Sequence, residues 1–276
     1  MKKILIPTDF SLNSYQTIDS VLKLFKDKVC DFYFLNTYTY NISGLDALGL
    51  LHEDEEWFDK PEEESKEKLG KLIERYTLKS SDSSHGFHAI TECSSRLDAI
   101  KKHQELLDID LIILSSGTNE NSDRENETIL EHVRNCPILL MPAHASIDKK
   151  ISMTIASDFK QKINTDQIDQ FRKSLNGKHV EIGILVLDKQ NQLSETVANN
   201  LEAFIGYLRQ FQNTKTNLEY AKTGSQLKAY ASSHANGIMC LVDKKPDLLR
   251  KIGLLKSDVI SKLKQLNSCT VLTIHQ

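Results

Sequence analysis

The stretch Ile4-Leu5-Ile6-Pro7-Thr8-Asp9-Phe10 is the most informative part of the chain, because it occurs twice. It returns as Met153-Thr154-Ile155-Ala156-Ser157-Asp158-Phe159. Each copy is a short apolar run followed by a small residue, Thr or Ser, Asp and Phe, and each precedes a segment of helical periodicity. A second pair of matching stretches, Cys136-Pro137-Ile138-Leu139 and Cys269-Thr270-Val271-Leu272, closes the two copies. The sequence therefore predicts an internal duplication whose second copy is the shorter one.

The length of the chain agrees with a duplication. Its 276 residues are enough for two hydrophobic cores of ordinary size. We predict a first domain over residues 1–146 and a second, diverged domain over residues 147–276. The boundary falls in the polar stretch Ala143–Lys149, directly after Pro142.

Charge and composition argue against several classes of protein. The 35 basic and 38 acidic side chains nearly balance, so nothing favours nucleic acid or an anionic membrane as a partner. No apolar run approaches the roughly 20 residues that span a bilayer. The five cysteines are scattered and form no Cys-x-x-Cys pair, which favours reduced thiols over a disulfide framework or a zinc site. We therefore predict a cytoplasmic protein.

Segments typical of buried strands alternate with segments of helical periodicity. The predicted strands are Lys3–Pro7, Asp31–Asn36, Phe87–Thr91, Leu111–Leu114, Ile138–Met141, Ile151–Ala156, Val180–Leu187, Leu218–Ala221, Ile238–Val242 and Thr270–Ile274. Helices are predicted between them, including one capped by Ser14, a short one through Ile129 and Val133, and one from Val259 to Leu266. The alternation indicates an α/β protein made of two doubly wound, flavodoxin-like parallel-sheet sandwiches in tandem. The last strands of the two sandwiches would be exposed edges, so we expect them to pair with each other.

Sheets of this kind bind ligands at the carboxyl ends of their strands, near the point where the strand order reverses. Asp9 and Asp158 follow equivalent strands in the two copies and are the first candidates for such a site. Pro7 and Thr8 lie beside Asp9 in the sequence. Gly117 and Thr118 follow the strand Leu111–Leu114 and are the next candidates, should an anion bind there.

These motifs resemble the universal stress protein family. Members open with a strand that ends in Pro-x-Asp-x-Ser, matched here by Pro7-Thr8-Asp9-Phe10-Ser11. A later strand of the type Asp-Leu-Ile-Val-Met is matched by Asp110-Leu111-Ile112-Ile113-Leu114, and a final Cys-Pro-Val-Leu-Val by Cys136-Pro137-Ile138-Leu139-Leu140. The resemblance covers the whole first half and, more weakly, the second. It implies the tandem two-domain type of the family, a role in stress adaptation, and a pair of domains that mimics a dimer within one chain.

The resemblance also implies a test for ATP, which many members hold with a loop of the form Gly-x2-Gly-x9-Gly-Ser/Thr after the fourth strand. Glycine is needed there because backbone amides must approach phosphate oxygens closely. In this chain Gly117 is the only glycine between Leu111 and Met141. Four carboxylates accompany a single Arg124 in the same stretch: Glu120, Asp123, Glu125 and Glu127. The segment Asn126-Glu127-Thr128 could replace part of the loop by forming an anion site at a helix N-terminus.

The second copy has no better loop. Asp243-Lys244-Lys245-Pro246-Asp247 comes after the strand Ile238–Val242, and Pro246 removes an amide donor. We therefore predict no cofactor, with weak or no ATP binding. The alternative is a stress switch that holds ATP in the first domain, with slow hydrolysis or none.

Other groups of residues are interpreted as structural. The acidic segment Glu53–Glu64 and the basic segment Lys244–Lys264 are each expected to be solvated, although contact between them in two copies of the chain would give a homodimer. Cys136 and Cys269 are expected to be small core residues. No metal-binding spacing and no catalytic motif is present. The sequence thus favours a protein that binds an unknown protein or small molecule and has no enzymatic activity.

Overall fold

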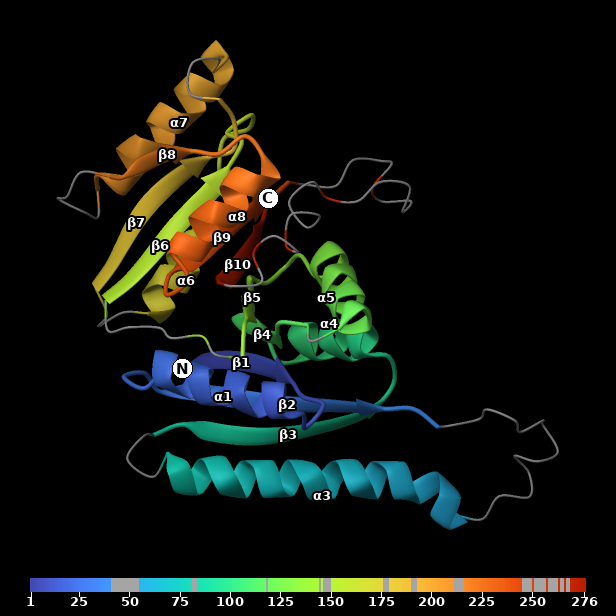
Figure 1. Cartoon of the computed structure of the whole chain (residues 1–276). Helices are drawn as coiled ribbons and strands as arrows, with labels where there is room; N and C mark the ends of the chain where they lie inside the picture. The colour runs from blue at the N-terminus through green and yellow to red at the C-terminus, as the bar shows by residue number, and fades with distance from the viewer. Residues whose placement is uncertain are drawn as a thin grey trace.

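The computed structural model describes residues 1–40, 55–80, 84–117, 119–143, 145, 150–175, 179–189, 193–210, 216–244, 250, 257, 263, 266 and 269–276. Within these residues, ten strands form one sheet (Figure 1). They are β1 (Lys2–Pro7), β2 (Cys30–Tyr38), β3 (Gly86–Cys93), β4 (Leu111–Ser115), β5 (Ile138–Met141), β6 (Lys150–Ser157), β7 (His179–Val186), β8 (Leu218–Tyr220), β9 (Ile238–Asp243) and β10 (Thr270–His275). All ten predicted strands are confirmed.

The order of the strands is β3-β2-β1-β4-β5-β10-β9-β6-β7-β8, so the second half repeats the order of the first. Within each half every pair of neighbouring strands is parallel. The doubly wound α/β class is therefore confirmed, and the strand order reverses beside β1 and beside β6. Within the first half β1 lies between β2 and β4, and β6 lies in the same way between β7 and β9 in the second.

The two halves join through their last strands. β5 and β10 are antiparallel, with Leu139 opposite Leu272 in the register. This pairing confirms the prediction from the sequence, and it satisfies backbone groups that would otherwise form two open edges.

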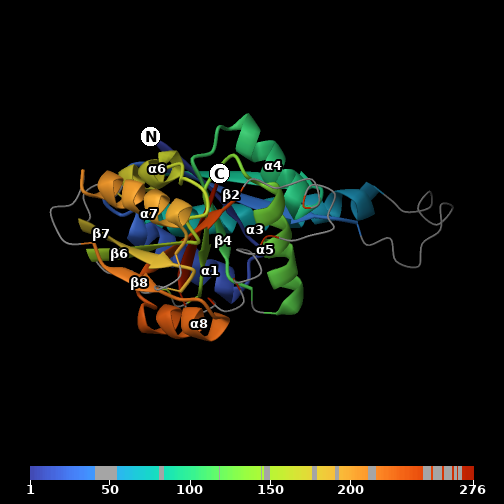
Figure 2. The ribbon, with the colours of Figure 1, turned by 90° about the horizontal axis from the view of Figure 1, so that it is seen from above.

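Seven helices in the described part of the chain cover the two faces of the sheet. They are α1 (Leu12–Leu24), α3 (Glu55–Lys79), α4 (Arg96–Leu106), α5 (Glu120–His132), α6 (Asp166–Ser174), α7 (Glu195–Leu208) and α8 (Gly224–Ser233). Core residues of α1, α3, α6 and α7 cluster together, and those of α4, α5 and α8 form a separate cluster. Figure 2 shows α6 and α7 on one side of the second half and α8 on the other.

The alternation of side chains along each strand explains the two core layers. Ile4 and Ile6 belong to the layer under α1, whereas Leu5 between them belongs to the layer under α4 and α5. Both layers contain residues from both halves, so apolar packing continues across the junction of β5 and β10. Cys136 and Cys269 are buried free thiols in one of these layers, as expected for small core residues.

The helices differ from their predictions at two places. Ser14 was wrong as the cap of α1, because the side chain of Ser11 accepts the hydrogen bond from the backbone N–H of Ser14. The helix predicted from Val259 to Leu266 lies mostly outside the described residues, although Leu263 and Leu266 themselves are buried. Residues 144 and 146–149 are also outside them, so the domain boundary stays a prediction.

No helix in the described part of the chain is long and apolar enough to cross a membrane.

Candidate functional site: two equivalent strand ends

The duplicated motif forms the same turn in both halves. Phe10 and Phe159 both adopt a left-handed backbone conformation, with φ of 59° and 51°. The side chains of Thr8 and Ser157 each accept a hydrogen bond from these Phe amides. One residue further on, Asp9 Oδ1 accepts from the amide of Ser11 at 3.0 Å, and Asp158 Oδ1 accepts from Lys160 at 3.1 Å. The turn directs the chain from a buried strand into the segment that leads to the next helix. We call the surroundings of β1 and β4 the first strand-end site, and those of β6 and β9 the second.

Polar side chains connect the first strand-end site. Asn13 donates to the carbonyl oxygen of Ser116 at 2.8 Å, which joins the start of α1 to the end of β4. Asn36 donates to the carbonyl oxygen of Thr8 at 2.8 Å, and the hydroxyl of Thr8 lies 2.7 Å from that of Ser14. Pro7 and Thr8 are buried, whereas Asp9 is exposed. Of these predicted residues, Asp9 alone presents its side chain to solvent.

Helix α5 begins much earlier than predicted and replaces most of the expected phosphate loop. Asn119 caps it: its Oδ1 accepts from the amides of Asn121 at 3.1 Å and Ser122 at 3.0 Å, and Ser122 Oγ completes a capping box. Two of the amides that could bind an anion are thus used by the chain itself. Asn126 and Thr128 lie inside the helix, so the predicted anion site at Asn126-Glu127-Thr128 was wrong.

Gly117 lies against the carboxylate of Asp123. A Cβ atom added to Gly117 would be 2.0 Å from Asp123 Oδ1 and 2.8 Å from the backbone nitrogen of Asp123. Glu120 and Asp123 both lie in the first turn of α5, where the helix dipole favours negative charge. A phosphate placed there would be repelled by about 1 kcal/mol for each carboxylate at close range in water. The surroundings of Gly117 therefore do not fit a triphosphate. Thr118 lies outside the described residues.

A lysine takes the place of this glycine at the second strand-end site. Leu111 pairs with Ile4, and Ile238 pairs with Met153, so the two registers make Lys244 equivalent to Gly117. Lys244 Nζ lies 2.5 Å from Asp158 Oδ2, and both side chains are partly exposed. The carboxylate that the sequence identified in the second half is thus neutralised by the chain itself.

Asp243, which precedes Lys244, is the centre of a buried ion cluster. It is 1% exposed and is bound by Arg134 Nη1, Arg250 and the hydroxyl of Ser257. Arg250 Nη2 lies 3.1 Å from Asp243 Oδ2 and 2.6 Å from Glu131 Oε2. Burial alone would raise the pKa of Asp243, but its contacts with the ring of His275, with Arg250, with Ser257 and with Arg134 outweigh burial and hold that pKa well below its usual range.

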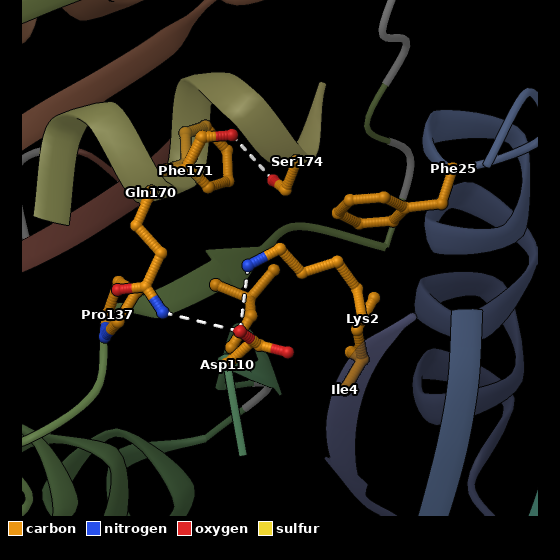
Figure 3. Close-up of a pocket in the computed structure, with 9 residues that line it drawn as sticks. Lys2, Ile4, Phe25, Asp110, Pro137, Gln170, Phe171 and Ser174 are labelled. Atoms are coloured by element: carbon orange, nitrogen blue, oxygen red, sulfur yellow. Dashed lines mark hydrogen bonds and ion pairs between the residues drawn. The ribbon is translucent and has the colours of Figure 1, made fainter. Parts of the chain in front are cut away.

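A small cavity lies at the other end of the strands, between the two halves (Figure 3). Lys2 Nζ contacts Asp110 Oδ1 at 2.7 Å, and Gln170 of α6 donates to the same oxygen. Burial opposes ionisation of Asp110, but hydrogen bonds from Lys2 and from the amide of Lys3 outweigh it and lower the pKa. The cavity has room for about one water molecule and is not at the ligand-binding edge of the sheet.

Solved structures identify the fold. A universal stress protein from Archaeoglobus fulgidus DSM 4304 matches with a TM-score of 0.66 and 15% identity, over 99% of this chain and 96% of that one. A universal stress protein candidate from Pseudomonas aeruginosa UCBPP-PA14 matches with a TM-score of 0.62 and 12% identity, over 100% and 93% of the two chains. The chain has the universal stress protein fold. PA1789 from Pseudomonas aeruginosa PAO1, a protein of unknown function, matches with a TM-score of 0.63 and 13% identity, over 100% and 92%.

Sequence comparison adds no relative to these structures. No protein-family model matches the chain, and no curated protein matches it. The universal stress protein fold is thus shown by the course of the backbone and not by overall identity.

The residues around the two strand ends were only partly found from the sequence. Asp9 and Asp158 do follow equivalent strands, and Asp158 meets a partner that the sequence did not suggest, Lys244. The Asp243 cluster was missed as well. The cap at Asn119 could have been predicted from the sequence, because a polar side chain three residues before Ser122 can form a capping box with it.

Proposed function

We propose that this chain acts in stress adaptation by binding a protein or a small ligand in the cytoplasm, without catalysis and with weak or no affinity for ATP. The universal stress protein fold supports the general role. Neither nucleic acid nor a membrane surface is proposed as a partner, because the charges of the chain nearly balance.

The main support for this proposal is that polar and charged groups of the chain itself occupy part of both strand ends. At the first, the Asp123 carboxylate lies against Gly117 and the Asn119 side chain occupies the amides of α5. At the second, Lys244 pairs with Asp158. A polyphosphate would have to displace these contacts, so its binding free energy would be reduced by their loss.

The absence of catalysis is proposed on the chemistry of the same groups. Asp9 bonds to a backbone amide, and Asp158 bonds to a backbone amide and to a lysine. General acid–base catalysis and nucleophile activation need two side chains in contact, one that gives up a proton and one that accepts it. In the described ranges, no three His, Cys, Asp or Glu side chains are grouped so that they could hold a metal ion.

Isothermal titration of the intact chain with ATP and magnesium tests the proposal. We expect no saturable heat at millimolar nucleotide. The control is a titration of the Asp9→Ala variant, which should give the same flat trace. Saturable heat in the unaltered chain that Asp9→Ala weakens would contradict the proposal and favour a nucleotide switch.

Such an ATP-binding switch, in which the first half holds the nucleotide, is the second candidate. One observation favours it: in the described part of the chain Asp9 makes no ion pair and is exposed, whereas its counterpart Asp158 is paired with Lys244. The first strand end thus keeps a carboxylate that a nucleoside hydroxyl could contact. Incubation with a panel of nucleotides, followed by product analysis, separates a switch without turnover from an enzyme.

A further inference from the structure

The ion cluster around Asp243 joins the two halves of the molecule. We define the junction cluster as Glu131, Arg134, Asp243, Arg250 and His275. Glu131 lies in the last turn of α5 and Arg134 follows that helix, both in the first half, and the other three belong to the second half. Arg134 Nη2 also donates to the carbonyl oxygen of Lys244 at 2.7 Å. The cluster therefore connects the halves through charged side chains, next to the backbone pairing of β5 and β10.

The charges of the junction cluster balance only while His275 is neutral. Two carboxylates, Glu131 and Asp243, face two guanidinium groups, Arg134 and Arg250. The side chain of His275 is 2% exposed, and its Nδ1 lies 3.6 Å from Asp243 Oδ2, beyond hydrogen-bond distance. Neither ring nitrogen of His275 has a hydrogen-bond partner in the described part of the chain. A proton on this ring would be a third positive charge in a buried site.

Two contacts hold the backbone of His275 in this position. It pairs with Asp243 in the register of β9 and β10. Its amide donates to Gln167 Oε1 of α6 at 2.8 Å, and Gln167 Nε2 in turn reaches the carbonyl oxygen of Arg134 at 3.4 Å. Because the backbone is fixed and the side chain is 2% exposed, the ring does not reach solvent in this arrangement, so its protonation would be relieved by separating the groups of the cluster.

We propose that the junction cluster is an acid-sensitive lock between the two halves, closed while His275 is neutral and opened when His275 takes up a proton. The opening weakens the pairing of β5 with β10 and separates Arg134 from Asp243. Mild acid is thereby converted into a change in how the halves are held together. The lock acts at the junction and not at the strand-end sites, so it operates whether or not ATP binds.

The direction of the pH effect depends on the charged groups that act on His275. Burial lowers its pKa and the two arginines lower it further, whereas Asp243 acts in the opposite direction. Because the pKa of His275 is lower in the folded protein than the ordinary value near 6.5, the opened form binds more protons as pH falls through that value. Closure is therefore favoured above about pH 6.5 and lost progressively below it. Asp243 responds in a lower range, below its ordinary pKa of 3.8.

Hydrogen–deuterium exchange of the full chain tests the lock. The measured quantity is the protection of the β5 and β10 amides, corrected for the intrinsic effect of pH on exchange. We expect protection to fall about tenfold between pH 7.5 and pH 5.5, since one proton changes an opening equilibrium by at most about tenfold per pH unit. Equal protection at the two pH values would overturn the proposal.

Variants attribute the effect to His275. His275→Gln should keep its pH 7.5 protection at pH 5.5, whereas His103→Gln should respond like the unaltered chain. His103 is a matched control because it is a buried histidine that bonds Glu92 within the first half. Should His275→Gln not fold, Arg250→Gln serves instead: it removes one of the positive charges that lower the pKa of His275 in the closed form, so the loss of protection between pH 7.5 and pH 5.5 should be smaller. A loss of protection that His275→Gln retains, or that Arg250→Gln leaves at its full size, would contradict the lock.

Discussion

The two strand-end sites share a backbone conformation but carry different side chains. Asp9 and Asp158 make the same hydrogen bond to the amide two residues ahead, and Phe10 and Phe159 share a left-handed conformation. The residues at the end of the neighbouring strand differ: Ser116 and Gly117 in the first half correspond to Asp243 and Lys244 in the second. The hydrogen bonds from backbone amides to the side chains of the turn are therefore enough to explain why the turn is shared. The residues at the ends of β4 and β9 decide what each site can bind.

The largest contrast is expected between Asp243 and Ser116, which occupy equivalent positions. Asp243→Ala would leave Arg134 and Arg250, which are partly buried, without their common partner, which should reduce the free energy of unfolding by about 3–5 kcal/mol. The control Ser116→Ala should change it by less than about 0.5 kcal/mol, because Ser116 bonds to Asn13 and Met141 through its backbone. Urea denaturation measures both. A similar loss in both variants would mean that the cluster does not distinguish the sites.

The second contrast concerns Gly117 and the space that Asp123 occupies. Gly117→Ala should reduce the free energy of unfolding by about 1–3 kcal/mol, because the new methyl group meets both the carboxylate and the backbone nitrogen of Asp123. Gly70→Ala is the control, since no atom lies within 4 Å of its added Cβ and helix α3 should gain about 0.5–1 kcal/mol. Thermal denaturation of Gly117→Ala and Gly70→Ala measures the two changes in stability. A neutral Gly117→Ala would show that the first site has room for a ligand.

A third, smaller effect compares the caps of α5 and α8, both of which form capping boxes. Asn119→Ala should reduce stability by about 1 kcal/mol, and Thr223→Ala by a similar amount. A titration of the two variants with inorganic phosphate, followed by the melting temperature, distinguishes the two caps. If Asn119 is what excludes anions from the first site, its replacement should allow phosphate to raise the melting temperature, and Thr223→Ala should not.

The smallest expected effect concerns the ion pairs of Asp158. Asp158→Ala and Asp9→Ala remove equivalent hydrogen bonds, but the first also removes the contact with Lys244 and the longer one, at 4.0 Å, with Lys160. The difference between the two losses of stability should be about 0.2–1 kcal/mol and should shrink as salt is added, since the pairs are partly exposed. A difference that salt leaves unchanged would mean that the pairs are more deeply shielded than their exposure indicates.

The fold was readable from the sequence because each strand is a short buried run with a clear boundary. The strands Leu111–Leu114 and Ile138–Met141 could be predicted without knowing any contact between distant segments. The two matching copies indicated that the second half repeats the strand order of the first. The early start of α5 was not readable from apolar periodicity. Residues 120–128 are almost entirely polar, so only the cap at Asn119 could have indicated a helix there.

The ion pairs at the second strand end could not be predicted from the sequence, for a different reason. Asp158 and Lys244 are brought together by the parallel pairing of β6 with β9, which depends on the strand order. Arg134 meets Asp243 only because β5 pairs with β10. Contacts between distant segments of this kind leave no local pattern in the sequence, whereas the hydrogen bonds of the Asp9 turn involve neighbours and could be predicted.

The pairing of β5 with β10 has a further consequence. When two identical chains associate, every substitution appears in both, so neither copy can evolve alone. Here one polypeptide supplies both partners, and each can change independently. A lysine can therefore close one strand end while a glycine remains at the other, and the asymmetry is inherited as a unit.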